Sequence, residues 1–499
     1  MEVLTPVRPK QGIHSRLADP ELVRSQIYVD GRWMPARDGG LQPVRNPATG
    51  EWLGSVPAAG AAETRIAIEA AQRAWPEWRA RTPDSRGAIL RKWGELMRAA
   101  SEDLALIMTL EQGKPLAEAR GEISYAASFL EWFAEEGRRA YGETIPSHKP
   151  QRRLLTIRQP IGVTAAITPW NFPSAMITRK AGAALAAGCP MVVRPADETP
   201  FSALALAVLA ERAGVPAGIF SVVTGDARTI AAVLTESSAV RALSFTGSTE
   251  VGRILLKQSA DTVKKVSLEL GGHAPFIVFD DVTVGRAAQL ALGAKFATSG
   301  QDCLAANRII VHRRIYEEFV EAFTALTAGM AVGNGLDPDV VIGPLMSESA
   351  VERCERQVSD AVQHGAKVRC GGKRHSAGPL FMQPTVLSDA TREMSIWREE
   401  TFGPVAAIAP FDTEDEAIAV ANDTEYGLAA YICTNDLGRA LRVGEALEYG
   451  MVAVNTDSFT GPPIPFGGMK QSGLGREGSR HGLDEYSEIK YLCLSVDAA

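Results

Sequence analysis

Ser299-Gly300-Gln301-Asp302-Cys303-Leu304-Ala305-Ala306-Asn307-Arg308 is the stretch around which this chain is organised. It joins a helical pattern of apolar residues over 287–298 to the β-branched run 309–311, which suits a strand. A thiol in such a loop is held by regular elements on both sides and can face a cleft, so Cys303 is the candidate nucleophile. The alternative is a small buried hydrophobic residue, as most free cysteines are.

Two segments upstream carry groups that could work with this thiol. Glu269 ends an apolar strand pattern, and the pair Gly271-Gly272 after it would let backbone and substrate approach closely. We interpret Glu269 as the candidate base; the alternative is a solvated glutamate. Asn171 precedes a helix that Pro173 is expected to begin, and it could donate a hydrogen bond to an oxyanion or cap that helix.

Length and composition place the chain among ordinary globular proteins. Its 499 residues exceed the size of one hydrophobic core, so at least two domains are expected. The formal net charge of −7 argues against a nucleic-acid partner. No apolar run reaches the roughly 18 residues of a membrane span, and residues 1–16 lack the apolar core of a secretory signal. We expect residues 1–16 to form a loose arm.

The cysteines give information about metals and compartment. All 6 are widely spaced, without a C-x-x-C pair or a neighbouring histidine cluster. This spacing predicts neither a zinc site nor a disulfide framework, and it fits a reducing, cytoplasmic compartment.

Strand and helix patterns alternate at short spacing between residues 163 and 270. Strands are expected at 164–167, 191–193, 219–223, 242–245 and 266–270, and helices at 173–187, 200–213, 227–234 and 250–259. Such alternation predicts a doubly wound parallel sheet, which places nucleotides at the carboxyl ends of its strands. The G-x-G-x-x-G fingerprint is missing. Phe245-Thr246-Gly247-Ser248 could instead present helix amides to a pyrophosphate, or form a turn with a Ser/Thr cap.

A second α/β series begins at His273, with strands at 274–279 and 307–312 and helices at 284–298, 316–328 and 347–364. Helices are also expected at 63–75, 83–99 and 101–142, the last broken at 113–115 and at Gly121, and we interpret them as packing helices. The segment 152–163 alternates charged and β-branched residues like an exposed strand, and 482–494 is expected to be a last strand.

These segments, in this order, resemble the aldehyde dehydrogenase superfamily. Glu400-Thr401-Phe402-Gly403-Pro404-Val405 and Pro465-Phe466-Gly467-Gly468 match two more of its motifs, and the resemblance runs from about Leu17 to the C-terminus. The runs 17–22 (LADPEL), 176–180 (MITRK) and 473–478 (GLGREG) look most like the NAD(P)-dependent succinate-semialdehyde dehydrogenase branch. Five motifs in register make a specific signal.

The resemblance implies an α/β architecture with a division into domains. It implies a Rossmann-type NAD(P)-binding domain over 17–144 and 162–271, and a catalytic domain over 272–470. Residues 145–161 and 471–499 would form a β arm used in oligomer contacts. We therefore expect a homodimer or homotetramer.

The resemblance also implies a reaction with a small-molecule aldehyde. The Cys303 thiolate would attack the aldehyde, and the Asn171 amide with the Cys303 backbone N–H would stabilise the oxyanion. Glu269, supported by Lys180, would then activate water to hydrolyse the thioester. The residues expected to bind NAD or NADP are Thr168, Pro169, Trp170, Arg194, Asp197, Gly225, Phe245, Thr246, Gly247, Ser248, Leu270, Glu400 and Phe402. Those expected to bind the substrate are Arg179, Phe172, Thr460 and Phe466.

Three positions that depart from the family pattern bear on the cofactor and the thiol. Arg194 stands where the family usually has a lysine, and Asp197 stands where it commonly has a glutamate. Arg194 would bind the 2′-phosphate of NADP, whereas Asp197 would repel it. The sequence therefore favours NAD only slightly. Ala305 replaces a cysteine with which some relatives form a redox-switch disulfide, so that disulfide is impossible here.

Other departures bear on the substrate. Arg179 is expected to bind the anionic end of succinate semialdehyde, but Ala297 stands where some relatives have a second arginine, Thr460 where serine is common, and His273 where lysine is common. A glutarate, malonate or sulfonated semialdehyde, or a broader range of aldehydes, therefore stays open. A catalytically silent binding protein and a coenzyme A-acylating dehydrogenase are less well matched, because Cys303, Glu269 and Asn171 are all present.

Overall fold

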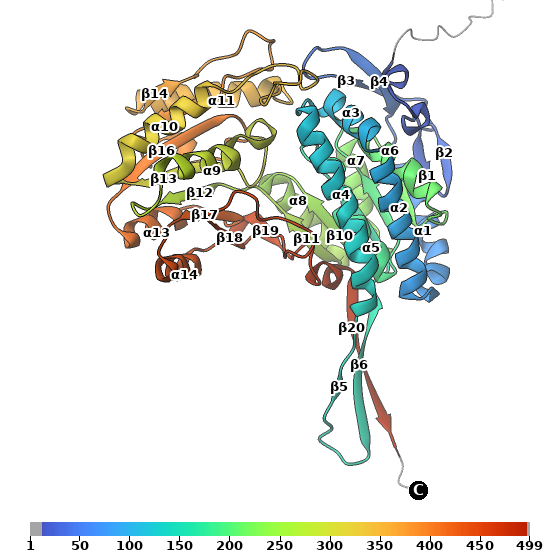
Figure 1. The fold of residues 1–499 in the computed structure, drawn as a ribbon. Helices are drawn as coiled ribbons and strands as arrows, with labels where there is room; N and C mark the ends of the chain where they lie inside the picture. The colour runs from blue at the N-terminus through green and yellow to red at the C-terminus, as the bar shows by residue number, and fades with distance from the viewer. Residues whose placement is uncertain (1–11, 497–499) are drawn as a thin grey trace, which may run out of the picture.

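The structure is a computed structural model, and residues 12–496 are described. Two mixed sheets with helices on both faces form the body, and a three-stranded arm extends away from it (Figure 1). This architecture confirms the predicted α/β fold class.

The first sheet has eight strands in the order β19-β11-β10-β7-β8-β9-β1-β2. The strands from β11 to β9 are parallel, whereas β19, β1 and β2 run antiparallel to their neighbours. Its strands are β1 (Ile27–Val29), β2 (Arg32–Met34), β7 (Val163–Ile167), β8 (Met191–Arg194), β9 (Phe220–Val222), β10 (Val240–Thr246), β11 (Lys265–Glu269) and β19 (Gly473–Leu474).

Helices cover both faces of this sheet, so its central strands read as continuous apolar runs; every residue of β7, for example, is buried. One hydrophobic core joins the sheet to α2–α6, and a second joins the opposite face to α1, α7 and α8. The helices are α1 (Ala61–Ala80), α2 (Pro83–Ala99), α3 (Ser101–Gln112), α4 (Leu116–Glu136), α5 (Ala175–Ala187), α6 (Pro200–Arg212), α7 (Ala227–Glu236) and α8 (Thr249–Ser259).

The second sheet has seven strands in the order β14-β15-β16-β13-β12-β17-β18, all parallel except β14. Its two faces also carry separate hydrophobic cores. The strands are β12 (Ala274–Val278), β13 (Ala306–His312), β14 (Lys367–Cys370), β15 (Thr385–Ser388), β16 (Val405–Phe411), β17 (Ala429–Cys433) and β18 (Met451–Val454). The helices are α9 (Val284–Phe296), α10 (Tyr316–Ala328), α11 (Glu348–Gln363), α12 (Ser395–Arg398), α13 (Glu414–Asn422) and α14 (Leu437–Ala446).

The arm is a sheet in the order β20-β6-β5, formed by β5 (Thr144–Ile145), β6 (Arg152–Pro160) and β20 (Ser487–Ser495). β20 pairs antiparallel with β6 along its whole length, from Ser487 opposite Pro160 to Ser495 opposite Arg152. The expected strand at 482–494 begins later than predicted, because His481–Tyr486 form the 3-10 helix η8. A hairpin of β3 (Leu41–Arg45) and β4 (Trp52–Pro57) lies apart from both large sheets.

Three boundaries predicted for the helices before residue 145 are wrong. α1 continues through the exposed Pro76 to Ala80, because Trp78 is buried and donates its indole N–H to the Leu185 carbonyl at 3.1 Å. α4 runs without a break past Gly121, whose cost of roughly 1 kcal/mol is outweighed by packing on the neighbouring helices. It also ends at Glu136, well before residue 142.

The predicted loose arm at 1–16 is wrong for its last part. Ile13–Arg16 form the 3-10 helix η1, and Ile13 is buried in the first core. Residues 1–11 lie outside the described part of the chain.

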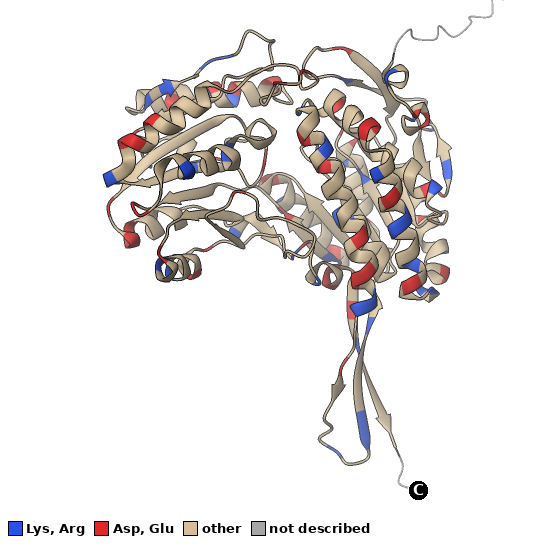
Figure 2. Cartoon of the chain, viewed as in Figure 1, with Lys and Arg blue, Asp and Glu red and all other residues tan. Residues whose placement is uncertain are grey.

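Acidic and basic side chains are interspersed over the outer helices α1, α2 and α4 (Figure 2). Within residues 12–496, no helix is both long enough and apolar enough to cross a membrane.

Candidate active site

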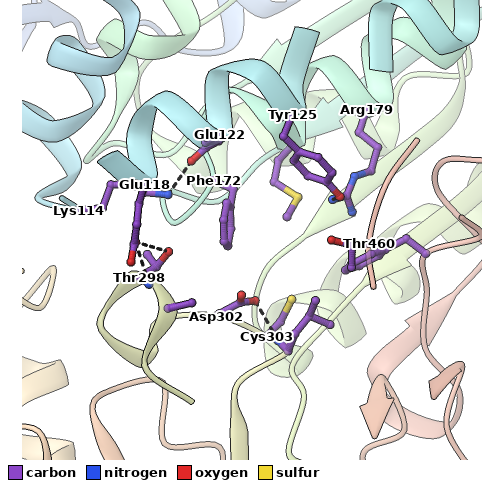
Figure 3. Close-up of a pocket in the computed structure, with 15 residues that line it drawn as sticks. Lys114, Glu118, Glu122, Tyr125, Phe172, Arg179, Thr298, Asp302, Cys303 and Thr460 are labelled. Carbon is purple, nitrogen blue, oxygen red and sulfur yellow. Dashed lines mark hydrogen bonds and ion pairs between the residues drawn. The ribbon is translucent and has the colours of Figure 1, made fainter. Parts of the chain in front are cut away.

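Cys303 lies in the wall between two cavities of about 320 and 310 Å³, and it lines both of them. The first cavity is bounded by α4, α5 and the segment around Thr460, as Figure 3 shows. The second is bounded by the loop after β7, the start of α8 and the segment around Glu400. A thiol in this position can contact one molecule on each side.

The loop that carries Cys303 is fixed by an unusual backbone. Thr298 and Ser299 have φ values of 50° and 58°, so α9 ends at Phe296 and the predicted helix over 284–298 is two residues too long. The Ser299 hydroxyl donates to the Gly343 carbonyl at 3.2 Å and accepts from the Gly343 N–H at 2.9 Å. At Gly300, with a φ of 73°, a Cβ would lie 2.3 Å from the Gly403 carbonyl oxygen.

The predicted close approach at Gly271-Gly272 is confirmed. A Cβ on Gly272 would lie 2.1 Å from the Cys303 carbonyl oxygen. The Gly272 N–H donates to Glu400 Oε1 at 2.9 Å, so this glycine pair brings β11, the cysteine loop and the Glu400 segment together.

Asn171 is buried beside the cysteine loop and donates from Nδ2 to the Gln301 carbonyl at 3.1 Å. It does not cap a helix: α5 begins at Ala175, not at Pro173, and Glu122 Oε1 accepts from the N–H groups of Ser174 and Ala175. The amide therefore has the position of a donor near the thiol.

The helix α4 forms one wall of the first cavity, which corrects its interpretation as a packing helix only. Lys114, Glu118, Glu122 and Tyr125 line the cavity (Figure 3). Lys114 precedes α4, whereas the spacing of Glu118, Glu122 and Tyr125 by three to four residues puts these three on one helix face. This periodic polar pattern was the sequence signal for the wall. Lys114 Nζ bonds to Glu122 Oε2 at 2.6 Å and to the Asn171 carbonyl at 2.7 Å.

Phe172, Arg179, Thr460 and Phe466, the residues predicted to bind substrate, all line this first cavity. The Arg179 guanidinium lies 4.2 Å from the centre of the Phe466 ring, and its Nη2 donates to the Tyr125 hydroxyl at 3.1 Å. Arg179 Nη1 also donates to Glu477 Oε2 at 3.3 Å. A buried cation thus stands at the end of the cavity beside Thr460 (Figure 3).

Glu269 is buried, and neither of its carboxylate oxygens has a hydrogen-bond partner within the described residues. Burial, and next the charge of Glu477, raise the pKa of Glu269 well above its ordinary value. Lys180 donates to Thr246 Oγ1 at 2.8 Å and is paired with Glu477 rather than with Glu269. Burial alone would raise the pKa of Glu477, but its pairs with Lys180 and Arg179 lower it.

Burial also raises the pKa of the Cys303 thiol well above 9.0, and the carboxylates of Asp302, Glu400 and Glu269 raise it further. Arg179 opposes this effect.

The second cavity contains most of the predicted cofactor residues: Pro169, Trp170, Thr246, Gly247, Ser248, Leu270, Glu400 and Phe402. Trp170 and Phe402 meet edge to face, with ring centres 5.6 Å apart. Ser248 is the N-cap of α8 and accepts from the Val251 N–H at 3.3 Å, so the interpretation of this loop as a capped turn is correct. The positive end of the α8 dipole lies at the cavity as well.

The other predicted cofactor residues lie near the carboxyl ends of β7, β8, β9 and β10 but do not line either cavity with Cys303. Arg194 Nη2 bonds to Asp197 Oδ1 at 2.5 Å and to the Gly225 carbonyl at 3.2 Å. Thr168 Oγ1 is buried without a partner in the described part of the chain, and Phe245 packs under Gly247. The orphaned hydroxyl, the helix terminus and the half-buried Glu400, whose pKa desolvation raises to about 7, fit a nicotinamide dinucleotide.

Two sequence departures have structural roles away from the cavities. His273 is buried, and its Nε2 lies 3.0 Å from the Trp397 carbonyl oxygen. Ala305 is buried within the cysteine loop, two residues after Cys303. Among residues 12–496, no cluster of three or more His, Cys, Asp and Glu side chains could hold a metal ion.

Sequence reasoning missed Glu477 and Asp302. Glu477 stands inside the GLGREG run, and its only signal was a carboxylate between glycines near the chain end. Asp302 precedes the nucleophile and lines the first cavity, where its Oδ1 accepts from the Leu304 N–H at 2.9 Å.

Comparison with known proteins gives consistent results. The family model described as "Aldehyde dehydrogenase family" matches residues 33–492. Succinate-semialdehyde dehydrogenase [NADP(+)] of Escherichia coli is 57% identical over 481 residues, which cover 96% of this chain and 100% of that protein. Glutarate-semialdehyde dehydrogenase of Pseudomonas aeruginosa is 57% identical over 479 residues, covering 96% and 99%. The crystal structure of Staphylococcus aureus betaine aldehyde dehydrogenase with NAD+ superposes with a TM-score of 0.94 at 33% identity, covering 98% and 97% of the two chains.

Proposed function

Because the chain belongs to the aldehyde dehydrogenase family, we propose that it oxidises a short semialdehyde with an anionic far end to the carboxylic acid, using NAD or NADP. Succinate semialdehyde is the best candidate substrate. The observation that carries this proposal is the position of Cys303 between a cavity that holds Arg179 and a cavity that fits a nicotinamide dinucleotide.

The chemistry follows from the groups around the thiol. Cys303 Sγ loses its proton to solvent and adds, as the thiolate, to the aldehyde carbon. The Asn171 amide with the Cys303 backbone N–H stabilises the oxyanion of the thiohemiacetal. When bound, the nicotinamide supplies the acceptor for the hydride that leaves this carbon. The thioester that results is hydrolysed by water from which Glu269 takes a proton, and the carboxylic acid is released.

Arg179 is proposed to bind the anionic end of the substrate. We expect Arg179→Ala to raise KM for succinate semialdehyde at least tenfold and to leave KM for butanal almost unchanged. The physical reason is the loss of a charge-assisted contact worth about 2–4 kcal/mol, or roughly 30- to 1000-fold in kcat/KM. Steady-state kinetics on both aldehydes check this.

Arg314→Ala is a matched control, because Arg314 is exposed and pairs with Asp280 on the surface. Equal effects of Arg179→Ala on both aldehydes, or no effect on either, would reject the anion pocket.

The cofactor is proposed to be NAD, by a small margin. The Asp197 carboxylate holds Arg194, which reduces the ability of the arginine to bind a 2′-phosphate, and its charge repels such a phosphate. We expect Asp197→Ala to raise kcat/KM for NADP by about tenfold, as one repulsive charge is removed. A hundredfold preference for NADP that survives Asp197→Ala and vanishes in Arg194→Lys would reverse this choice.

The identity of the semialdehyde is the second open choice. Ala297 and Thr460 line the first cavity and add no second cation to Arg179. A glutarate, malonate or sulfonated semialdehyde is therefore the alternative substrate class, and an aldehyde panel with each nicotinamide cofactor tests it. Detection of acid rather than acyl-coenzyme A as the product excludes a thioester-transferring enzyme.

The remaining expectations are part of the same proposal. Residues 17–144 and 162–271 bind the cofactor, 272–470 carry the nucleophile, and the arm of 145–161 and 471–499 joins subunits into a homodimer or homotetramer in the cytoplasm. Exposed Ile489, Tyr491 and Leu494 on β20 support an assembly role for the arm.

A further inference from the structure

Three buried ions adjoin the proposed anion pocket. Arg179 and Lys180 are consecutive on α5, and Glu477 lies between β19 and η8; all three are nearly inaccessible to solvent. One Glu477 oxygen accepts from Arg179 at 3.3 Å, and the other accepts from Lys180. One carboxylate is therefore shared by two cations, and the cluster keeps one uncompensated positive charge.

Only Arg179 of these three lines the cavity that contains Cys303. Its guanidinium is oriented by more than Glu477: the Phe466 and Phe129 ring centres lie 4.2 and 5.1 Å away, and the Tyr125 hydroxyl lies at 3.1 Å. Arg179 Nε is buried without a partner in the described residues, so the side chain keeps a donor for a ligand.

Glu269 shares the electrostatic environment of this cluster. Glu269 on β11 lies opposite Thr246 on β10, and the Thr246 hydroxyl accepts from Lys180 at 2.8 Å. The charges that act on Glu269 are those of Glu477, Lys180, Arg179 and Arg476. If Glu269 loses its proton, its charge offsets the one remaining positive charge of Arg179, Lys180 and Glu477, and Arg476 stays as a further cation outside this cluster. A substrate anion and the ionised Glu269 would then compete for one cation.

We propose that Lys180 and Glu477 are positioning residues that set the net charge available at Arg179. This charge determines the preference for aldehydes with an anionic end, and the proton on Glu269 controls the same charge. This inference rests on the proposed function, because it takes Arg179 as the anion site. Lys180 prevents Glu477 from neutralising Arg179. By linkage, an anion bound at Arg179 makes Glu269 harder to ionise, and ionised Glu269 weakens the binding of the anion.

Two substitutions with opposite effects on charge test the first part. The measured quantity is the ratio of kcat/KM for succinate semialdehyde to kcat/KM for butanal, which cancels changes in catalysis common to both aldehydes. Lys180→Met makes the cluster neutral and should lower this ratio by about tenfold or more, whereas Glu477→Gln adds a net positive charge and should raise it. A ratio that is unchanged or lowered in Glu477→Gln overturns the charge-sharing role, because a merely structural role lowers it in both variants.

Tyr125→Phe is the matched control, because it changes the orientation of Arg179 without changing the charge of the cluster. It removes one neutral hydrogen bond to Arg179 and should change the ratio less than Lys180→Met does. An equal or larger effect overturns the proposal in favour of orientation.

The second part is tested by binding, which does not depend on turnover. In a Cys303→Ala background, where no thiolate can form, calorimetry gives the Kd of succinate as a function of pH. The sign follows from the raised pKa of Glu269: binding is strongest at low pH, while Glu269 is protonated, and weakens by about tenfold as it ionises. Glu269→Gln in the same background should make the Kd independent of pH.

The role of the proton is overturned if the Kd of succinate does not change with pH while Glu269 is present. It is also overturned if Glu269→Gln leaves the pH dependence of that Kd unchanged. These measurements keep the proposal testable if Lys180→Met does not fold. If Arg179→Ala has no selective effect, the proposed anion pocket itself fails; if that variant is selective but the Lys180 and Glu477 variants do not differ in sign, only the charge-sharing inference fails.

Discussion

Replacing Cys303 with alanine will abolish aldehyde oxidation, lowering kcat by at least about 10⁴-fold, because no other group can form the covalent adduct. The change removes a single sulfur atom from a residue that lines two cavities, so fold and cofactor binding should persist. Steady-state kinetics measure the first effect, and thermal melting with cofactor titration measures the second.

Cys370→Ala is the matched control. Cys370 is half-buried on β14, in the second sheet, and lines neither cavity. Full activity in this control together with aldehyde oxidation by Cys303→Ala would show that Cys303 is not the nucleophile.

Replacing Glu269 with glutamine should separate the two halves of the reaction. One equivalent of reduced cofactor per active site should form in a burst, after which the enzyme stalls as the thioester and steady turnover falls by about 10²- to 10⁴-fold. Stopped-flow absorbance resolves the burst, and mass spectrometry of the quenched protein identifies the acyl group on Cys303.

The same variant has a pH signature. Burial and the Glu477 charge raise the pKa of Glu269, so the base form of the carboxylate grows as pH rises. Deacylation in the unmodified enzyme should accelerate with pH through that titration, and Glu269→Gln should lose this dependence. Slow turnover without a burst would mean that Glu269 acts earlier, on the thiol.

Much of the fold was predictable because local pattern and tertiary packing agree. The strands β7, β8, β10 and β11 lie within two residues of their predicted ends, since each is an apolar run bounded by turn residues. The errors arose where burial overrode a local signal. Pro76 and Gly121 are exposed on their helices, so the packing of the opposite faces continues both helices past them.

The site was predictable where a residue type implies its chemistry. Cys303 and Asn171 were predicted from the loops that carry them, and both line the second cavity. Glu269 was predicted from the end of its strand; it is buried at the end of β11 and lines neither cavity. The α4 wall and Glu477 were missed because their roles depend on contacts between segments distant in sequence. Glu477, for example, meets Lys180 across a separation of 297 residues. A periodic helix pattern shows which face is polar, but not which cavity that face will line.

The left-handed turn at Thr298, Ser299 and Gly300 has a consequence for how this enzyme could be diversified. Few side chains tolerate this backbone, and a Cβ at Gly300 would clash with Gly403. Nearly every substitution at these three positions should therefore lower the yield of folded protein. Ala297 and Thr460 also line the first cavity, but neither has a left-handed backbone. A library restricted to Ala297 and Thr460 should therefore yield a high proportion of soluble variants with altered aldehyde preference, and natural divergence within such a scaffold would be expected to follow the same two positions.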